Sequence, residues 1–190
     1  MRRFVPALAA LALAGCFGGA KLPPTLLTLT SAAAEASIAR SAAATQAVTI
    51  EVPIAPREIR QVRVPVLEGP GQVTYVRDLQ YVDTPDKLFQ QLLSETVRRT
   101  TSRVVLDPGQ AGLDPGQRVS GVLQRFGHDA LSGQVVVTYD ATLTSGTSGQ
   151  VRTQRFTASA PADGTAATVG PALNQAANEV ARQAAAWIDG

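Results

Sequence analysis

The sequence predicts an α+β domain, with a mostly antiparallel sheet and two amphipathic helices packed on one face of that sheet. Three observations support this class. Several segments alternate apolar and polar side chains with the period of two that is typical of half-buried strands. Two longer segments place apolar side chains at helical spacing. Finally, the order along the chain is strands, helix, strands, helix, which favours helices segregated from the sheet over a regular α/β alternation.

The chain divides into three expected regions. Residues 1–15 form an export signal, residues 16–46 contain a first short strand and an Ala-rich flexible segment, and residues 47–190 form the folded domain. The part that follows the signal, about 175 residues, is long enough for one domain with its own hydrophobic core.

Strands dominate the first half of the expected domain and the segment before it. Thr25–Thr30 has strand propensity through its Thr and Leu content, whereas Ser31–Ala47 could be a weakly held helix but would bury little, which favours a mobile loop. The next strand should bury one face, formed by Val48, Ile50, Val52 and Ile54. The same alternation predicts strands at 62–66 and 72–77, joined by a turn at Glu68–Gly71.

A helix should begin at Thr84. This residue can cap the free amides, Pro85 suits the first helical position, and Asp86 complements the positive end of the helix dipole. One stripe of this helix is apolar and should pack on the sheet; it consists of Leu88, Phe89, Leu92, Leu93 and Val97.

The second half predicts a short buried strand at 104–106, three antiparallel strands at 118–129, 133–144 and 149–158, and a closing helix at 165–188. The inner face of that helix is rich in small side chains, namely Ala176, Ala177, Ala181, Ala184 and Ala185. Two interpretations remain open. The small side chains let the helix approach the sheet closely, or they leave room for an acyl chain.

The N-terminus has the features of a secretory signal. Arg2 and Arg3 precede an uncharged stretch that ends at Ala14, which is too short to span a bilayer. At the end of that stretch stand Leu13, Ala14, Gly15 and Cys16, which together resemble the bacterial lipobox.

The lipobox resemblance implies cleavage before Cys16 and a covalent diacylglycerol and N-acyl chain on that residue; no other cofactor is expected. Cys16 is the single cysteine, so it has no disulfide partner within the chain. Phe17 stands where Asp would signal retention in enterobacteria, and this resemblance favours the periplasmic face of the outer membrane.

Composition argues against nucleic-acid binding and against common enzyme classes. Seventeen Lys and Arg face fifteen Asp and Glu, and two of the arginines lie in the signal, so the remaining chain is neutral. His128 is the one histidine and is expected to be a solvated loop residue. The chain has no Gly-x-Ser-x-Gly, no phosphate-binding Gly-rich loop and no metal-ligand spacing. We therefore expect neither a catalytic residue nor a metal site.

The order of several weak motifs is more informative than any one of them. The lipobox is followed by Leu27–Leu29, Val48–Pro53, an aromatic-x-Asp-x-Pro segment at Tyr81–Pro85, and Gly121–Phe126. This order, which ends in a terminal helix carrying Trp187, resembles the ABC-type transport auxiliary lipoprotein family, although that family often has Trp where this chain has Tyr81.

The family resemblance implies a non-enzymatic, lipid-anchored envelope protein. Its expected partners are the membrane, an MCE-domain protein, and the permease and ATPase subunits of an ABC transporter that moves lipids or other apolar compounds. Some members form rings, so a homo-oligomer is also expected. The alternatives are a module that binds lipid directly and an envelope scaffold or assembly lipoprotein.

Docking residues can be suggested only from residue type. Tyr75, Tyr81 and Trp187 are large aromatics in a chain with few of them, and aromatic residues are enriched at interface hot spots. Core packing is the competing role for each of these three.

Overall fold

The structure is a computed structural model that describes residues 25–35, 41, 43, 46–110, 116–145 and 149–190. The lipobox residues Leu13, Ala14, Gly15 and Cys16 lie outside the described residues. Among the described helices, none is long and apolar enough to cross a membrane.

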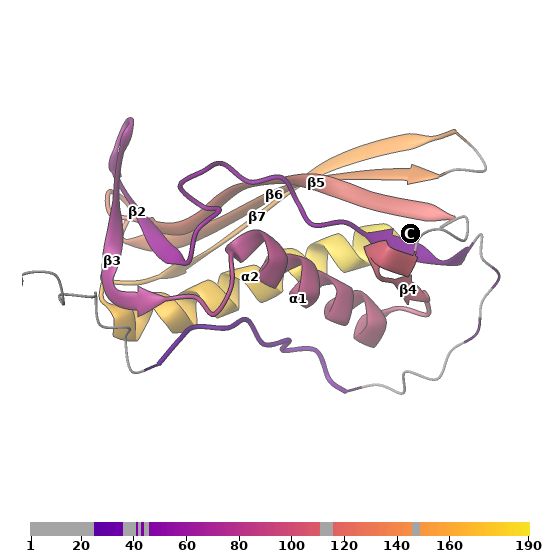
Figure 1. Ribbon diagram of the computed structural model, residues 1–190, viewed down its shortest axis with the longest axis horizontal. Coiled ribbons are helices and arrows are strands. Elements are labelled where there is room, and N and C mark those ends of the chain that lie inside the picture. Colours follow the sequence, from indigo (N-terminus) through magenta and orange to yellow (C-terminus); the bar gives the residue numbers. More distant parts are fainter. Residues whose placement is uncertain (1–24, 36–40, 42, 44–45, 111–115, 146–148) are drawn as a thin grey trace, which may run out of the picture.

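The described residues form one seven-stranded sheet and two long helices, as the α+β prediction required (Figure 1). The strands are β1 Val48–Ile50, β2 Arg63–Gly69, β3 Gln72–Gln80, β4 Val105–Leu106, β5 Gln117–Asp129, β6 Gln134–Ser145 and β7 Val151–Pro161. The helices are α1 Pro85–Thr100 and α2 Ala166–Asp189, and a short 3₁₀ turn spans Pro108–Gln110.

The sheet is mostly antiparallel, as predicted, but it is mixed rather than purely antiparallel. β2–β3, β5–β6 and β6–β7 are antiparallel pairs, whereas β1 pairs in parallel with β4 and β5, and β2 pairs in parallel with β5. The long strand β5 explains this difference. One of its edges is occupied by β6, and the other is shared by β1, which pairs Thr49 with Arg118, and β2, which pairs Leu67 with Asp129.

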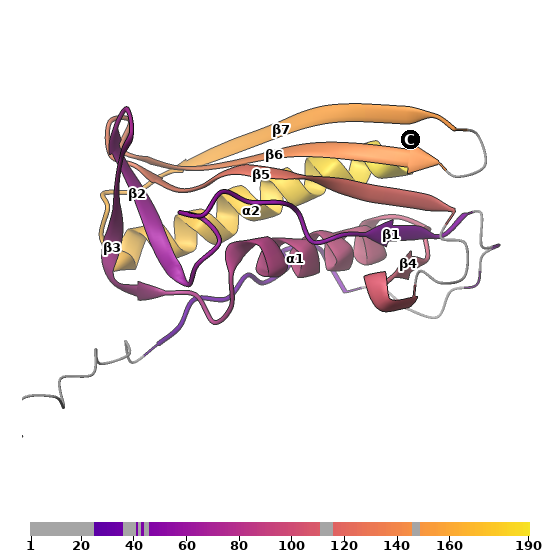
Figure 2. The ribbon, with the colours of Figure 1, turned by 45° about the horizontal axis from the view of Figure 1, so that its top comes forward.

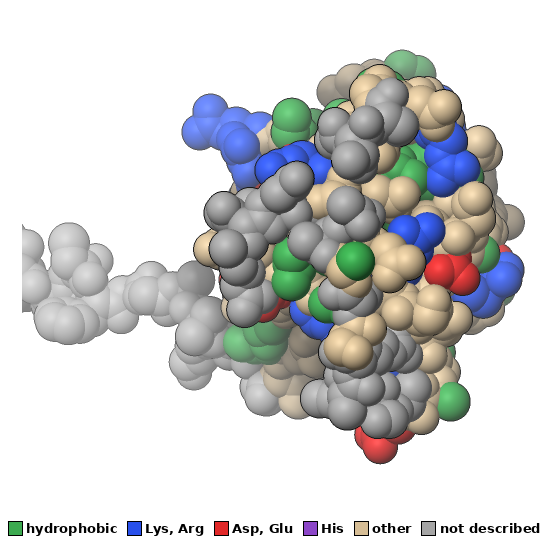
Figure 3. All heavy atoms as spheres, turned by 90° about the vertical axis from the view of Figure 1, so that its right-hand side faces the viewer, with side chains coloured by type: hydrophobic (Ala, Val, Ile, Leu, Met, Phe, Trp, Pro, Cys, Tyr) green, Lys and Arg blue, Asp and Glu red, His purple; other side chains and the backbone are tan. Residues whose placement is uncertain are grey.

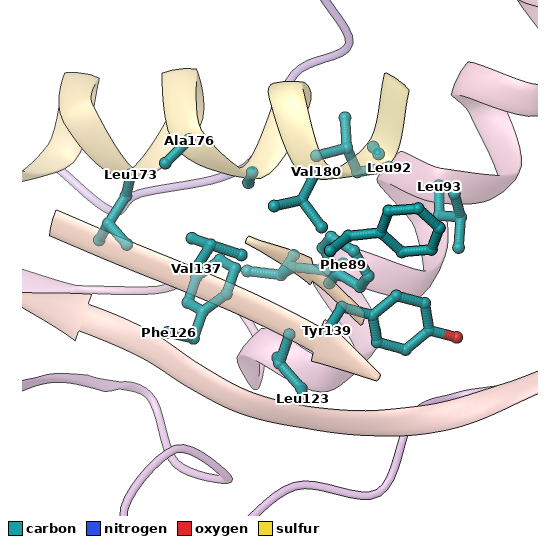
Figure 4. Packing of buried hydrophobic residues seen from close by; sticks show 14 of the residues in the cluster. Phe89, Leu92, Leu93, Leu123, Phe126, Val137, Tyr139, Leu173, Ala176 and Val180 are labelled. Carbon is teal, nitrogen blue, oxygen red and sulfur yellow. The ribbon is translucent and has the colours of Figure 1, made fainter. Parts of the chain in front are cut away.

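Both helices cover the same face of the sheet (Figure 2). α1 and α2 contact each other, and α2 also contacts β6 and β7. Between the layers, the Phe89 ring of α1 lies 5.0 Å from the Tyr139 ring and 6.5 Å from the Phe126 ring, measured between ring centroids. Leu173 and Val180 of α2 face Val137 in the same cluster (Figure 4). The apolar stripe predicted for each helix is therefore the stripe that builds the core.

The alanines of α2 pack closely against the neighbouring elements rather than leaving room for an acyl chain. Ala177, Ala181, Ala184 and Ala185 are all fully buried. Because a methyl group projects little from the helix, α2 can lie close to β6, β7 and α1. The close-packing interpretation of these small side chains is thus the one that the structure supports.

One predicted strand buries only part of the face that the prediction assigned to the core. Val48 and Ile50 are buried as expected, but Val52 and Ile54 are exposed, Ile54 by 71%. Ile50 pairs with Val119 and Ile54 with Val122, so four steps along this chain oppose three along β5. One extra residue on a strand reverses the faces that follow, and the exposure of Val52 and Ile54 is the result.

The N-terminal segment is tied to the helical layer. The strand expected at Thr25–Thr30 is an extended segment with a single bridge, between Leu27 and Tyr81. Beyond it, the Thr30 amide donates to Asn174 Oδ1 at 2.9 Å and the Ala32 amide donates to Asn178 Oδ1 at 2.7 Å. Asn178 Nδ2 also donates to the Thr30 carbonyl at 2.8 Å. We call residues 25–33 the strap.

Candidate functional site

Tyr81 lies in the core and not at a surface. Its side chain is 2% exposed and its ring centroid is 6.0 Å from that of Phe126. The hydroxyl has no hydrogen-bond partner among the described residues, and burial raises its pKa well above the ordinary value for tyrosine. A ring in this position packs the domain and is out of reach of a docking partner.

Tyr75 is half-buried and joins β3 to the turn that precedes β2. Gln61 Nε2 donates to the Tyr75 hydroxyl, and the guanidinium carbon of Arg63 lies 4.0 Å from the centroid of the Tyr75 ring. Gln61 Nε2 also contacts the carbonyls of Arg57 and Glu58, at 3.4 and 3.3 Å. The aromatic ring therefore holds the 57–61 turn in place through one amide side chain.

A cleft of about 250 Å³ lies beside Tyr75, between the β2–β3 hairpin and the outer face of the sheet; we call it the hairpin cleft. Val73 stands two residues before Tyr75 on the same side of β3, and Pro65 pairs with Tyr75 across the hairpin. The apolar lining comes from both sides and consists of Ile59, Pro65, Leu67, Val73, Phe126 and Val136. The cleft can accept an apolar group.

The lining of the hairpin cleft contains one carboxylate, Glu58, and one guanidinium, Arg125. Arg125 is paired with Asp129 at 2.8 Å, and the hydrogen bond from Arg125 is the main reason that the Asp129 pKa falls below its usual value. Within the described part of the chain, no carboxylate forms an ion pair with Arg57, Arg60 or Arg63.

His128 is not the solvated loop residue that was expected. It belongs to β5, is 6% exposed, and its Nε2 lies 3.0 Å from the carbonyl oxygen of Ala162. The ring therefore fixes the connection between β7 and α2. Over the described ranges, no group of three His, Cys, Asp or Glu is arranged to hold a metal ion.

Trp187 lies at the opposite margin of the helical layer, where α2 meets β7. It is half-buried, with its ring centroid 5.8 Å from that of Phe156 and the Arg152 guanidinium carbon 5.1 Å from its own ring centroid. At this end of the molecule, hydrophobic side chains show only as small separate patches (Figure 3). Tyr75 and Trp187 are thus two separate candidate contacts, on different sides of the domain.

Sequence patterns could not reveal the hairpin cleft. Its lining comes from segments as far apart as Glu58 and Val136, and no spacing within one segment indicates that they meet. One local signal was Gly127, where a Cβ atom would overlap the Pro65 carbonyl, because a glycine in a strand often marks a close backbone approach.

Comparison with known proteins gives one family. The sequence profile described as ABC-type transport auxiliary lipoprotein component matches residues 27–185. No curated protein sequence matches the chain significantly.

Several solved structures are similar in fold. A protein from Xanthomonas campestris aligns with a TM-score of 0.64 and 16% identity, over 88% of this chain and 92% of that one. An uncharacterised protein aligns with a TM-score of 0.60 and 12% identity, over 76% and 90%. The PelC dodecamer from Paraburkholderia phytofirmans aligns at 0.43 and 13%, over 74% and 88%. The first two establish a shared fold.

Proposed function

Because the chain belongs to the family of ABC-type transport auxiliary lipoprotein components, we propose that it is a non-enzymatic adaptor of an ABC transport system, anchored to the periplasmic face of the outer membrane through Cys16. The observation that carries this proposal is the extent of the family match. Residues 27–185 run from the strap into the last turns of α2, so the match covers the folded domain rather than one motif.

The proposed partners are an MCE-domain protein and the permease and ATPase subunits, and the proposed cargo is a lipid or another apolar compound. The order of motifs from the lipobox to Trp187 supports this, together with two exposed features that could receive a protein partner. These are the hairpin cleft beside Tyr75 and the margin of α2 at Trp187. Assembly into a homo-oligomeric ring is part of the same proposal and follows from the family resemblance alone.

The proposed anchor is consistent with the lipobox chemistry. A diacylglycerol and an N-acyl chain on one cysteine would hold the protein firmly, because each buried methylene contributes about 0.8 kcal/mol. Only eight residues separate Cys16 from Thr25, where the described strap begins, and they can span about 30 Å at most. The domain would therefore stay close to the membrane surface.

The anchor is tested by metabolic labelling with an alkyne-tagged palmitate, followed by separation of inner and outer membranes. Wild-type chain should carry the label and sediment with the outer membrane, whereas Cys16→Ser should carry none. An equally labelled Cys16→Ser chain would refute the assignment of the lipid to this residue. Labelled protein found in the inner membrane alone would refute the proposed location.

The adaptor role is tested by co-expression of the full chain with the MCE-domain protein, permease and ATPase of the same organism. Detergent extracts purified through a tag on this chain should contain those subunits. The role is rejected if none of them is recovered while the transporter subunits still co-purify with one another.

A further inference from the structure

The outermost strand of the sheet, β7, has one edge free. Within the described residues β7 pairs only with β6 (Figure 2). At one end of the β6–β7 ladder the Ser145 amide donates to the Gln150 carbonyl, and at the other end the Ala162 amide donates to the Gly133 carbonyl. These two bonds show which residues of β7 face β6. In an antiparallel ladder every second residue bonds across, so residues 152, 154, 156, 158 and 160 bond to β6. Val151, Thr153, Arg155, Thr157 and Ser159 direct their backbone groups to the free edge.

We propose that this free edge binds an extended, acidic segment of a partner protein, which adds to the sheet as a further strand. The inference rests on the proposed function in one respect only, that the chain acts through a protein partner. It names a surface and a binding mode that the family match does not supply.

The edge lacks most of the features that usually prevent strand addition. Natural edge strands are commonly short, bulged, or protected by proline and lysine. β7 has eleven residues, its register with β6 has no shift, and its only proline is the terminal Pro161. By contrast, β4 has two residues. An edge as long and regular as β7 is a template for another strand.

Charge on β7 indicates the chemistry of the partner. Residues 151–161 contain Arg152 and Arg155 and no carboxylate. Arg155 is held by Asp140 at 2.6 Å, whereas Arg152 forms no ion pair in the part of the chain that the structure describes. Arg152 and Arg155 lie on opposite faces of β7, so an added strand would place one side chain of each face next to an arginine, which favours glutamate or aspartate at those positions.

Space beside the edge is available on the helical side. An open hollow of about 700 Å³ lies over α2, lined mainly by residues of the strap, α1 and α2, and it reaches β7 at Ser159. Phe156 and Trp187 form an aromatic contact farther along the same margin. Side chains of an added strand that point toward the helices would meet this hollow and the half-buried Trp187 ring.

Two proline variants test the edge, since each removes one outward amide and leaves the ladder with β6 intact. They are Thr153→Pro and Thr157→Pro, and the matched control Thr157→Val keeps the amide while removing the hydroxyl that contacts Thr138 Oγ1. Thermal unfolding identifies any variant that fails to fold, and the other proline position then carries the test.

The first arm measures co-purification of the full chain with the MCE-domain protein. Thr153→Pro and Thr157→Pro should reduce recovery of the partner at least ten-fold, whereas Thr157→Val should not. If wild type recovers the partner and folded proline variants recover it equally, the inference is overturned while the proposed function stands. If wild type recovers no partner, the proposed function fails and the second arm decides the inference.

The second arm needs no natural partner. A fluorescein-labelled peptide of alternating valine and glutamate is titrated with the full chain in detergent, and binding is followed by polarisation. We expect saturable binding that falls at least ten-fold in the proline variants and is lost with a valine–lysine peptide. Failure of wild type to bind, or equal binding by the proline variants, overturns the inference. Self-association of the wild-type protein that Thr157→Pro abolishes would also overturn the inference, because the free edge of β7 would then bind a second copy of this chain.

Discussion

At the scale of single residues, Tyr81 combines a well-packed ring with a hydroxyl that has no partner in the described part of the chain. Tyr81→Phe removes a polar group that gains nothing from burial, so the free energy of unfolding should stay the same or rise. Tyr81→Ala leaves a cavity and should lower it by about 3–5 kcal/mol. Urea unfolding of both variants measures the difference. A loss above about 1 kcal/mol in Tyr81→Phe would mean that the hydroxyl has a partner after all.

Asp163 gives the domain a predictable response to acid. Its carboxylate accepts hydrogen bonds from the Thr168 hydroxyl and from the Thr165 hydroxyl and amide, which lower its pKa to about 2. Because the pKa is lower in the folded than in the unfolded chain, the stabilisation is present above about pH 4 and is lost as the pH falls toward 2.

Asp163→Asn tests this response through the melting temperature at pH 6 and pH 2.5. The variant should melt below wild type at pH 6, and the gap should be much smaller at pH 2.5, where the stabilisation is partly lost. Other carboxylates titrate in the same range, and the Glu179 pKa is also lowered to about 2, chiefly by Arg182. Glu179→Gln is therefore the matched control. A gap between Asp163→Asn and wild type that is as large at pH 2.5 as at pH 6 would contradict the prediction.

Some residue-level expectations needed long-range information. Thr84 stands at the cap position of α1 as predicted, but its side chain makes no capping hydrogen bond, and the Asp83 carboxylate instead accepts the Thr84 amide at 2.7 Å. His128 is buried because the 162–165 connection folds back over β5, which no local pattern indicates. Residue type suggested Tyr75, Tyr81 and Trp187 as candidate contacts, but it could not show which of these aromatic side chains is accessible.

At the scale of elements, the β2–β3 hairpin depends on a close approach to β5. At Gly127 an added Cβ would overlap the backbone carbonyl of Pro65, which cannot move aside like a side chain. Gly127→Ala should therefore lower the free energy of unfolding by about 1–3 kcal/mol. Gly69→Ala is the control, since a Cβ there meets no atom within 4 Å. Denaturant unfolding compares them, and equal stability of the two would refute the close contact.

Removing the Asn178 side chain should detach the strap from α2. Asn178 bonds the Ala32 amide and the Thr30 carbonyl, so Asn178→Ala removes two hydrogen bonds to the strap, each worth about 1 kcal/mol. Hydrogen exchange at Ala32 should accelerate about ten-fold or more, and the rest of the domain should exchange as before. Gln175→Ala, one turn of α2 away, should leave the Ala32 amide unchanged. Unaltered exchange in Asn178→Ala would show that other contacts hold the strap.

Elements with strong local periodicity were predictable. α1, α2 and β5 to β7 agree with the sequence within a few residues, because each buries one regular face. The parallel pairs were not predictable, because Val48–Ile50 meets β5 only across about seventy residues of sequence. The displaced face at Val52 and Ile54 comes from one extra residue opposite β5, and a single strand cannot show that.

At the scale of the whole molecule, the packing of α2 bears on the lipid-binding alternative. Ala177, Ala181 and Ala184 are fully buried by protein atoms of the described residues, which argues against an acyl chain between the helices and the sheet. Native mass spectrometry of Cys16→Ser protein, which lacks the proposed anchor, should therefore show the mass of the polypeptide alone. A stoichiometric adduct of lipid mass would restore the lipid-binding alternative.

The strap also determines how the domain would respond to a pull on its membrane tether. Its contacts follow α2 in one direction, from Leu27 near Gly170 to Thr30 at Asn174 and Ala32 at Asn178. For a chain tethered through Cys16, tension directed along α2 loads these bonds in shear, so they share the force. Tension directed away from α2 peels them one at a time. The same linkage would resist a steady axial load and yield to a sideways one.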